Sequence, residues 1–329
     1  MKTLRIENFG NPMEVTSIVE LDSIPVTSSQ VRVHLELSPI NPADLLGIQG
    51  MYPQKKKLPS TFGSEGIGQI VEIGSDVSHL KIGDRIILPL GFDCWKDEFV
   101  LESKSLFALP PGDPKQLAMI SINPPTAYAL INDIIELNPG DWIIQNAANS
   151  AVGRYVIQIC KDRGIKTINI VRRESLVAEL KEIGADIVIV DNELLHNQIP
   201  EITADKSIKL GLDAVSGNGT NLLCKFMGEK GTIVIYGAMS GKPMLIDLGM
   251  VMKKDLTIRS FWLVHWLRET NRDKIKTVYT ELTKLVAFKK LSAVVDSIFP
   301  LTQYQDAFKL AISSGRNGKV LFSGPAYSD

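Results

Sequence analysis

The most constraining feature of the sequence is a series of short apolar segments in its second half, each followed by a stretch of helical character. These segments are rich in β-branched residues and lack polar alternation, which indicates strands buried on both faces. Strands that alternate with helices predict βαβ units and a parallel sheet. The predicted strands are Trp142–Gln145, Thr167–Val171, Ile187–Val190, Leu212–Val215, Thr232–Tyr236 and Leu256–Ser260.

The part of the chain before Pro110 has a different pattern. Short β-branched or alternating runs are separated by Gly and Pro, as in Val31–Leu35, Gly68–Ile73 and Arg85–Leu88. This spacing predicts a β-rich unit with irregular loops. A helix is predicted from Asn123 through Ile134.

The last part of the chain follows the final predicted strand. We expect an amphipathic helix at Arg272–Phe288, then a strand, a helix and a strand that ends at Phe322. We expect this tail to pack against the β-rich unit. The predicted fold is therefore α/β, with a Rossmann-type doubly wound parallel sheet domain and a β-rich domain. The predicted boundaries are 1–116 for the β-rich domain, 117–260 for the dinucleotide-binding domain and 261–329 for the returning segment.

Length and composition agree with a globular protein of about two domains. The chain has 329 residues, of which 44% are hydrophobic, and its 36 basic and 37 acidic residues give a net charge of −1. Roughly 150 residues form a typical domain. Balanced charge removes the electrostatic basis for non-specific nucleic-acid binding, so no nucleic-acid partner is expected.

The cysteines and the N-terminus bear on location. Three scattered cysteines, Cys94, Cys160 and Cys224, are too few for a disulfide scaffold or a four-thiolate zinc site. The start MKTLRIENFG lacks the apolar core of a secretion signal, and no run of 18 apolar residues occurs. We expect a cytoplasmic protein without a membrane partner.

A phosphate-binding loop is predicted after the strand Trp142–Gln145. The residues Asn146–Gly153 lead into a helix with apolar Val152, Val156 and Ile159, which is the position of a glycine-rich phosphate loop. Only Gly153 of the G-x-G-x-x-G pattern is present, because Ala148 and Ala151 occupy the other two positions. Small side chains still let a pyrophosphate approach the helix N-terminus, where free N–H groups attract anions.

The end of the next strand bears on the choice of cofactor. An acidic residue about 20 positions after the loop would bind the ribose 2′-hydroxyl of NADH. This chain has Arg172 and Arg173 there, and guanidinium groups pair well with a 2′-phosphate. NADPH is therefore favoured over NADH, with an exposed pair at a helix start as the alternative.

Taken together, the motifs resemble a known family. The whole chain resembles the medium-chain dehydrogenase/reductase superfamily, which implies that the β-rich domain is GroES-like and catalytic. More narrowly, five segments in the same order are similar to the 2-enoyl thioester reductases of mitochondrial-type fatty acid synthesis. These segments are Pro39–Asp44, Ile48–Tyr52, Asn123–Tyr128, Ile144–Ser150 and Phe261–Trp266.

The resemblance also implies that the site contains no metal. Zinc-dependent members have a Cys near the segment Asn41–Asp44 and a Gly-His-Glu where this chain has Gly63, Ser64 and Glu65. Without a zinc ion, carbonyl reduction to an alcohol loses its usual polarising group. We interpret Asp44 and Glu65 as structural hydrogen-bond acceptors.

The activity that the resemblance implies is hydride transfer from NADPH to the β-carbon of a trans-2-enoyl thioester, followed by protonation of the α-carbon. Tyr52 is the implied proton donor, and a phenol, with an ordinary pKa of about 10, is protonated at neutral pH. The alternative is a Tyr that only fills a loop. The implied substrate is an enoyl-CoA or an enoyl-acyl carrier protein.

The resemblance assigns further residues to the cofactor. Asn123 would contact the nicotinamide ribose or order the site, and Lys319 would reach the cofactor unless it is an edge charge. The other implied cofactor-binding residues are Asn149, Ser150, Ala151, Val152, Arg172, Arg173, Tyr236, Gly237, Ala238, Met239, Phe261, Trp262 and Leu263. Many relatives have glycine near position 151 and at position 238, where this chain has alanine.

The substrate pocket is predicted from two tryptophans. Trp262 and Trp266 lie four residues apart, so on a helix they share a face and could form one wall of an acyl pocket. Core packing is the alternative role. The resemblance implies a homodimer, to which Leu245–Leu248 and Leu256–Ile258 could contribute. Two other functions stay open: a zinc-free quinone oxidoreductase and a nucleotide-binding protein without turnover.

Overall fold

The structure is a computed structural model that describes residues 1–91, 93–192 and 195–328. It divides into two compact units. Unit 1 consists of Met1–Ile122, Thr280–Lys289 and Val294–Asp329, and unit 2 consists of Asn123–Tyr279 and Lys290–Ala293. The domain boundaries predicted from the sequence are 116 and 260, whereas these units divide after Ile122 and after Tyr279. The tail from Val294 belongs to unit 1, as the sequence predicted.

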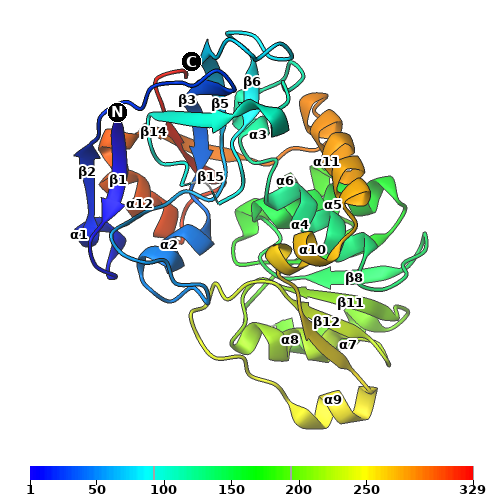
Figure 1. Cartoon of the computed structure of the whole chain (residues 1–329). Helices are drawn as coiled ribbons and strands as arrows, with labels where there is room; N and C mark the ends of the chain where they lie inside the picture. The colour runs from blue at the N-terminus through cyan, green and yellow to red at the C-terminus, as the bar shows by residue number, and fades with distance from the viewer. Residues whose placement is uncertain (92, 193–194, 329) are drawn as a thin grey trace. The chain divides into compact units, whose positions relative to one another are not determined.

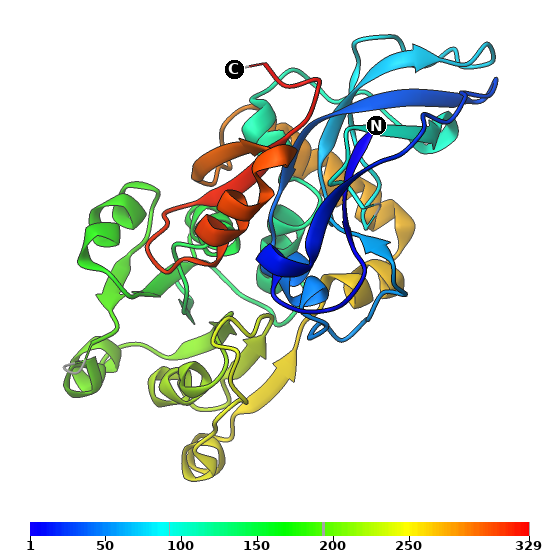
Figure 2. The same ribbon diagram turned by 90° about the vertical axis from the view of Figure 1, so that its left-hand side faces the viewer.

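Unit 1 is built around the long strand β3 (Gln30–Pro39), which runs through the larger sheet in Figure 2. The strand order is β14-β15-β3-β5-β6, and β7 also pairs with β3. A second sheet has the order β2-β1-β4. The other strands are β1 (Lys2–Ile6), β2 (Thr16–Glu20), β4 (Ser60–Thr61), β5 (Ile67–Ile73), β6 (Arg85–Ile87), β7 (Glu98–Glu102), β14 (Val295–Pro300) and β15 (Lys319–Ser323).

The helices of unit 1 are short, and three of them begin at a proline. Proline suits the first helical position, because its missing N–H has no partner there in any case. Asn or Asp precedes each of these prolines. The helices are α1 (Pro12–Val15), α2 (Pro42–Ile48), α3 (Pro114–Leu117) and α12 (Tyr304–Ile312). Helices α1, α2 and α3 were not predicted from the sequence.

The core of unit 1 joins the returning tail to the first hundred residues. The ring of Trp95 lies 5.4 Å from that of Phe308 on α12 and 5.2 Å from that of Phe322 on β15. All three side chains are fully buried. Because aromatic burial of this size dominates core energetics, the tail is part of the fold of unit 1.

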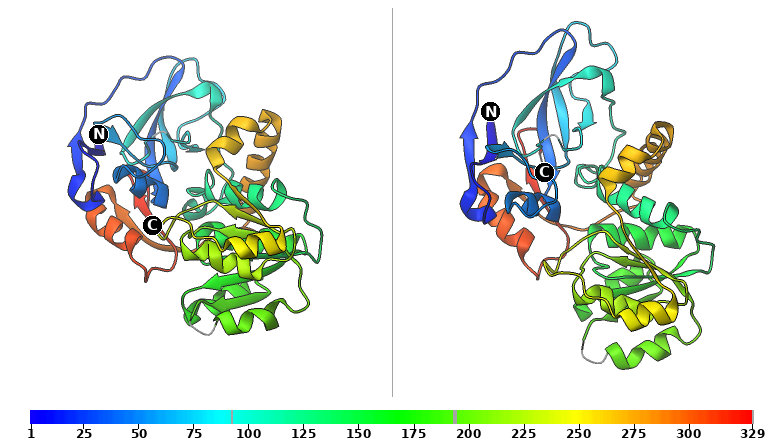
Figure 3. Two further views of the ribbon diagram at one scale, coloured as in Figure 1. Left: turned by 90° about the horizontal axis from the view of Figure 1, so that it is seen from below. Right: turned by 60° about the horizontal axis from the view of Figure 1, so that its bottom comes forward.

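Unit 2 contains the predicted parallel sheet, with the strand order β10-β9-β8-β11-β12-β13. Helices α4, α5 and α6 lie on one face of the sheet and α7 and α8 on the other (Figures 1 and 3). The strands are β8 (Trp142–Gln145), β9 (Lys166–Val171), β10 (Ile187–Val190), β11 (Ile208–Asp213), β12 (Thr232–Ile235) and β13 (Thr257–Ser260).

The helices that surround this sheet are α4 (Asn123–Asn132), α5 (Ala151–Asp162), α6 (Val177–Glu182), α7 (Leu195–Thr203), α8 (Asn218–Phe226), α9 (Leu248–Lys254) and α10 (Leu263–Glu269). The long helix α11 (Arg272–Ala287) crosses from unit 2 into unit 1 along the chain. Three 3₁₀ turns are Ser103–Ser105, Glu174–Leu176 and Leu301–Gln303. Among the described residues, no helix is both long and apolar enough to span a membrane.

One strand prediction was wrong at both ends. The segment expected at Leu212–Val215 is β11, which begins at Ile208 and ends at Asp213. Lys209 and Gly211 interrupt the apolar run at its start. Asp213 ends the strand because its carboxylate accepts hydrogen bonds from the N–H groups of Val215 and Ser216, both at 2.8 Å, which turns the chain. The helix α4 also ends at Asn132, two residues short of its predicted end.

Candidate active site

The predicted phosphate loop lies between β8 and α5 in unit 2. Ser150 is the N-cap of α5, and its hydroxyl accepts a hydrogen bond from the Gly153 N–H at 3.1 Å. A Cβ atom at Gly153 would lie 2.5 Å from the carbonyl oxygen of Ala148. Glycine is therefore required for the close approach of helix and loop at this position. Asn149, Ser150, Ala151 and Val152 are all in the loop or the first turn of α5.

A polar network lies beside this loop at the point where the strand order reverses between β8 and β11. The Asn146 amide donates to Asp213 Oδ1 at 2.7 Å and accepts from the Ala214 N–H at 2.8 Å. The Thr220 hydroxyl donates to Asp213 Oδ2 at 2.5 Å. Ligands of open α/β sheets bind at such a switch point. Asp213 and Thr220 were not among the predicted site residues, although a polar residue at the end of an apolar strand was a usable signal.

Tyr236 follows β12 at the same edge of the sheet. Burial and the nearby Asp213 raise the pKa of its phenol. Ser150 is near enough to counteract this shift in part, but the geometry is not that of a hydrogen bond, and the buried hydroxyl has no hydrogen-bond partner among the described residues. A buried polar group without a partner is costly. The hydroxyl therefore suits a polar ligand bound beside the loop.

The segment after Tyr236 continues along this edge. A Cβ atom at Gly237 would lie 2.7 Å from the carbonyl oxygen of Ala214, so the chain is closely packed there. Ala238 and Met239 are exposed, Met239 by 50%. Their exposure leaves them accessible to a ligand at the carboxyl ends of the strands.

Arg172 and Arg173 directly follow β9, as the sequence predicted. Arg172 is exposed, whereas Arg173 is half-buried and precedes the turn Glu174–Leu176. The helix N-terminus, the unpartnered Tyr236 hydroxyl and the two guanidinium groups all belong to the carboxyl edge of one parallel sheet. These residues fit a dinucleotide with an additional phosphate.

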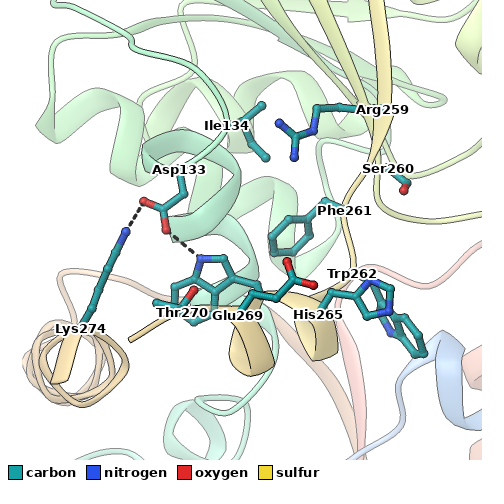
Figure 4. Close-up of a pocket in the computed structure, with 11 residues that line it drawn as sticks. Asp133, Ile134, Arg259, Ser260, Phe261, Trp262, His265, Glu269, Thr270 and Lys274 are labelled. Atoms are coloured by element: carbon teal, nitrogen blue, oxygen red, sulfur yellow. Dashed lines mark hydrogen bonds and ion pairs between the residues drawn. The ribbon is translucent and has the colours of Figure 1, made fainter. Parts of the chain in front are cut away.

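A cavity of about 480 Å³ lies in unit 2 beyond the end of β13 (Figure 4). Phe261, Trp262 and Trp266 line it, together with charged residues that include Arg259 and Glu269. The Trp266 indole N–H donates to Asp133 Oδ2 at 2.7 Å, and Lys274 pairs with Asp133 Oδ1 at 2.7 Å. Leu263, which follows Trp262 in the sequence and is the first residue of α10, is buried. The two tryptophans therefore share a cavity, and their role in an acyl pocket stays a prediction.

Tyr52 lies in unit 1, four residues after α2. Its backbone N–H donates to the Leu46 carbonyl at 3.1 Å, and its side chain is half-buried. The preceding Gly50 has φ +70°, and a Cβ there would lie 2.9 Å from Phe9 Cγ. A side chain at position 50 would be strained and crowded, so glycine fixes the turn that presents Tyr52. Asn123 begins α4 in unit 2 and is 5% exposed.

Asn41, Asp44 and Glu65 form a hydrogen-bonded cluster in unit 1. The Asn41 amide donates to Glu65 Oε1 at 2.9 Å, and the N–H groups of Ser121 and Ile122 donate to Glu65 Oε2 at 3.1 and 3.0 Å. Asp44 accepts from the Asn41 N–H at 2.9 Å. Both carboxylates are acceptors, as predicted. Within the part of the chain that the structure describes, no three His, Cys, Asp or Glu residues form a group that could bind a metal ion.

Lys319 is part of this cluster and is not an edge charge. It belongs to β15, an inner strand of the sheet, is 6% exposed, and donates a hydrogen bond from Nζ to Asn41 Oδ1. Burial lowers the pKa of Lys319 to about 8, against the attraction of Glu65. Burial raises the pKa of Glu65 to about 7, against the attraction of Lys319. The structure thus buries one cation among two carboxylates.

We expect Glu65→Gln to change how stability depends on pH. Because the folded-state pKa of Glu65 lies above the ordinary value of 4.5 for this side chain, its contribution to stability is complete below about pH 4.5 and is lost as pH rises through about 7. The Glu65→Gln variant lacks this loss of stability at higher pH. Its unfolding free energy relative to wild type should rise by on the order of 2–3 kcal/mol between pH 5 and pH 8.

Chemical denaturation at several pH values measures this change. The lowered pKa of Lys319 gives a contribution that is present above about pH 10.5 and lost as pH falls through about 8, so it does not reverse the expected slope. Glu20→Gln, at an exposed position, is the control. Parallel pH profiles for wild type and Glu65→Gln would contradict the prediction, whatever the constant offset between them.

Comparison with known proteins places the chain in a family. Residues 27–107 match the alcohol dehydrogenase GroES-like domain, and residues 151–284 match the zinc-binding dehydrogenase family. The mitochondrial enoyl-[acyl-carrier-protein] reductase of Rattus norvegicus is 37% identical over 319 residues, which cover 95% of this chain and 86% of the rat protein. The enzyme of that name from Homo sapiens is 35% identical over 330 residues, covering 98% and 88%.

Solved structures show the same relationship. A complex of Etr1p with NADP and crotonyl-CoA has a TM-score of 0.86 and 27% identity, and covers 98% of this chain and 99% of its own. The Escherichia coli quinone oxidoreductase complexed with NADPH has a TM-score of 0.84 and 25% identity, covering 98% and 100%. The GroES-like and dinucleotide-binding units together define the class of medium-chain dehydrogenases and reductases. Within this class, the chain belongs to the enoyl-[acyl-carrier-protein] reductase family.

Proposed function

We propose that the protein reduces the C2–C3 double bond of trans-2-enoyl thioesters with NADPH. The observation that carries the proposal is the 37% identity to an enoyl-[acyl-carrier-protein] reductase along nearly the whole chain. The Etr1p complex with NADP and crotonyl-CoA supports the same chemistry. The carboxyl edge of the sheet in unit 2 supplies groups that suit the phosphates of NADPH.

In this proposal, some residues of the chain bind the cofactor and another donates the proton. Ala151 and Val152 would bind the pyrophosphate at the start of α5, and Arg172 and Arg173 would pair with the 2′-phosphate. Tyr52 would donate its phenolic proton to the α-carbon. NADPH, when bound, supplies the hydride that the β-carbon accepts.

The remaining predicted residues support these steps. Asn123 and Lys319 would order the nicotinamide end of the cofactor, with Lys319 held through Asn41. Tyr236, Gly237, Ala238, Met239, Phe261, Trp262 and Leu263 would flank the nicotinamide. Trp262 and Trp266 would line the acyl chain in their shared cavity. The substrate is an enoyl-CoA or an enoyl-acyl carrier protein.

The test follows loss of NADPH absorbance with trans-2-hexenoyl-CoA. We expect saturable turnover whose product is the hexanoyl thioester, identified by mass spectrometry. Purified protein that binds NADPH but leaves the enoyl thioester unreduced at all concentrations would refute the proposed activity and favour a nucleotide-binding protein without turnover.

The second candidate is NADPH-dependent quinone reduction, because the E. coli quinone oxidoreductase has the same fold over 98% of this chain. A quinone accepts a hydride without a positioned phenol. The same assay with an ortho-quinone therefore separates the two functions. Fast quinone reduction together with no reduction of hexenoyl-CoA would favour this candidate.

We further propose a homodimer formed by unit 2. β13 is one of the two outer strands of its sheet, as far as the described residues show, and Leu245, Ile246 and Leu248 are exposed apolar side chains in the same unit. Exposed apolar side chains near an outer strand are typical of an interface. Light scattering after gel filtration gives the mass; a monomeric mass at micromolar concentration would contradict the dimer.

A cytoplasmic location also remains a prediction. Cys94, Cys160 and Cys224 are free and buried, which suits a reducing compartment. The names of the relatives place those proteins in mitochondria. Fractionation of the source cells would decide the location.

A further inference from the structure

Arg154 is a buried cation in the first half of α5, and the proposed reaction does not use it. Arg154 is only 2% exposed, and its neighbours in the sequence, Tyr155 and Val156, belong to the apolar core. Burying a charge is costly unless hydrogen bonds and an opposite charge compensate it. The contacts of this guanidinium therefore indicate why the position is basic.

One of these contacts is with the phosphate loop. Arg154 Nε donates a hydrogen bond to the backbone carbonyl of Asn149 at 3.1 Å. This peptide joins Asn149 to Ser150, the N-cap of α5. A carbonyl oxygen carries a partial negative charge, so its direction matters beside a binding site for a pyrophosphate. The guanidinium holds this carbonyl, while the N–H of the same peptide, on Ser150, donates to the Ala147 carbonyl at 2.9 Å.

Another contact reaches a second helix. A terminal nitrogen of Arg154 pairs with Glu179 Oε1 on α6 at 2.8 Å. Burial lowers the pKa of Arg154, and Glu179 counteracts the shift, so the guanidinium keeps its charge. The helix α6 follows Arg172 and Arg173 after one 3₁₀ turn. Arg154 thus connects the phosphate loop to α6.

We infer that Arg154 is a positioning residue that holds the Asn149 carbonyl in the orientation that the cofactor pyrophosphate requires at the start of α5, with Glu179 orienting its guanidinium. The inference deepens the proposed function and rests on its cofactor. Arg154 itself need not touch the cofactor, since it acts through a backbone carbonyl.

The same helix offers a matched control. Arg163, at the C-terminal end of α5, also donates to backbone carbonyls, those of Ile131 at 3.2 Å and Leu137 at 2.9 Å. It therefore connects the C-terminal end of α5 to the last turn of α4 and to the segment after α4, away from the phosphate loop. Loss of Arg163 should lower stability without a selective effect on any part of the cofactor.

The experiment measures binding of three ligands by calorimetry to wild type, Arg154→Met and Arg163→Met. NADPH and ADP-ribose contain the pyrophosphate, whereas adenosine 2′-monophosphate lacks it. For Arg154→Met we expect a 10- to 100-fold weaker affinity for NADPH and ADP-ribose, and an affinity for adenosine 2′-monophosphate within about two-fold of wild type. Arg163→Met should bind all three ligands like wild type.

Two results would overturn the inference: unchanged affinity for ADP-ribose, or an equal loss for all three ligands. Glu179→Gln decides the question if Arg154→Met does not fold, because it removes only the charge of a half-buried partner. We expect it to weaken ADP-ribose binding several-fold and to leave adenosine 2′-monophosphate unchanged; no selective loss would overturn the inference. If wild type binds neither NADPH nor ADP-ribose, the proposed function fails first.

Discussion

Replacing Tyr52 by Phe is expected to lower the rate of hexenoyl-CoA reduction by about 10²-fold or more while leaving NADPH affinity within two-fold of wild type. The variant keeps the ring and removes the hydroxyl that donates the proton to the α-carbon. A positioned general acid contributes about 10²- to 10⁴-fold to a rate. The residual rate reflects protonation by water. Stopped-flow measurement of NADPH consumption under single-turnover conditions gives the chemical step directly.

The control for this variant is Tyr304→Phe, which removes a phenolic hydroxyl from the same unit. The Tyr304 ring packs against Phe308 at 6.0 Å, so its aromatic contact remains in the variant. We expect normal reduction of hexenoyl-CoA by Tyr304→Phe. If Tyr52→Phe retains more than half of the wild-type rate, Tyr52 is a loop residue and the proton has another source.

The strands of unit 2 could be predicted from the sequence because a strand buried on both faces tolerates few polar residues. Ile143 and Ile144 of β8 are fully buried, as are Ile168 on β9 and Ile233 on β12. Their apolar runs are visible without any knowledge of tertiary contacts. β11 was misplaced because its start contains Lys209, which pairs with Asp141 at 2.8 Å. That partner lies far away in sequence, so a local pattern could not account for the charge.

The polar contacts of the site could not be predicted for the same reason. The hydrogen bond between Asn146 and Asp213 joins residues 67 positions apart, and that between Lys319 and Asn41 joins residues 278 positions apart. The motifs indicated which residues are chemically suited to a site but not their partners. Lys319 illustrates the difference, because its side chain could have been an edge charge until the strand order placed β15 inside the sheet.

Arg154 shows a signal that was present in the sequence and was not used. It stands among apolar residues in the helix that follows the phosphate loop, where a charge on the buried face needs a partner. Only the apolar spacing of this helix was used for the prediction, and the charged residue Arg154 was not considered. When a predicted ligand loop lacks the expected glycines, a buried charge next to the loop is therefore a more informative signal than the sequence of the loop itself.

We expect the choice between NADPH and NADH to depend on the two arginines that follow β9. We expect Arg172→Ala/Arg173→Ala to weaken NADPH binding by about 10²-fold or more and to change NADH binding by only a few-fold. A hydrogen bond to a charged group contributes about 1.5–3 kcal/mol, and each arginine can make at least one to a 2′-phosphate. NADH lacks that phosphate, so its affinity does not depend on hydrogen bonds from these two arginines to a 2′-phosphate.

The measurement compares kcat/KM for NADPH and NADH with hexenoyl-CoA in wild type and in the double variant. Arg268→Ala is the control, since Arg268 is an exposed arginine of unit 2 that pairs with the neighbouring Glu269. Binding of NADPH to the double variant should also depend less steeply on salt, because two phosphate contacts are removed. An unchanged ratio of the two kcat/KM values would mean that Arg172 and Arg173 only begin a surface turn, and that the preference for the phosphorylated cofactor has to come from other residues at the carboxyl edge of the sheet.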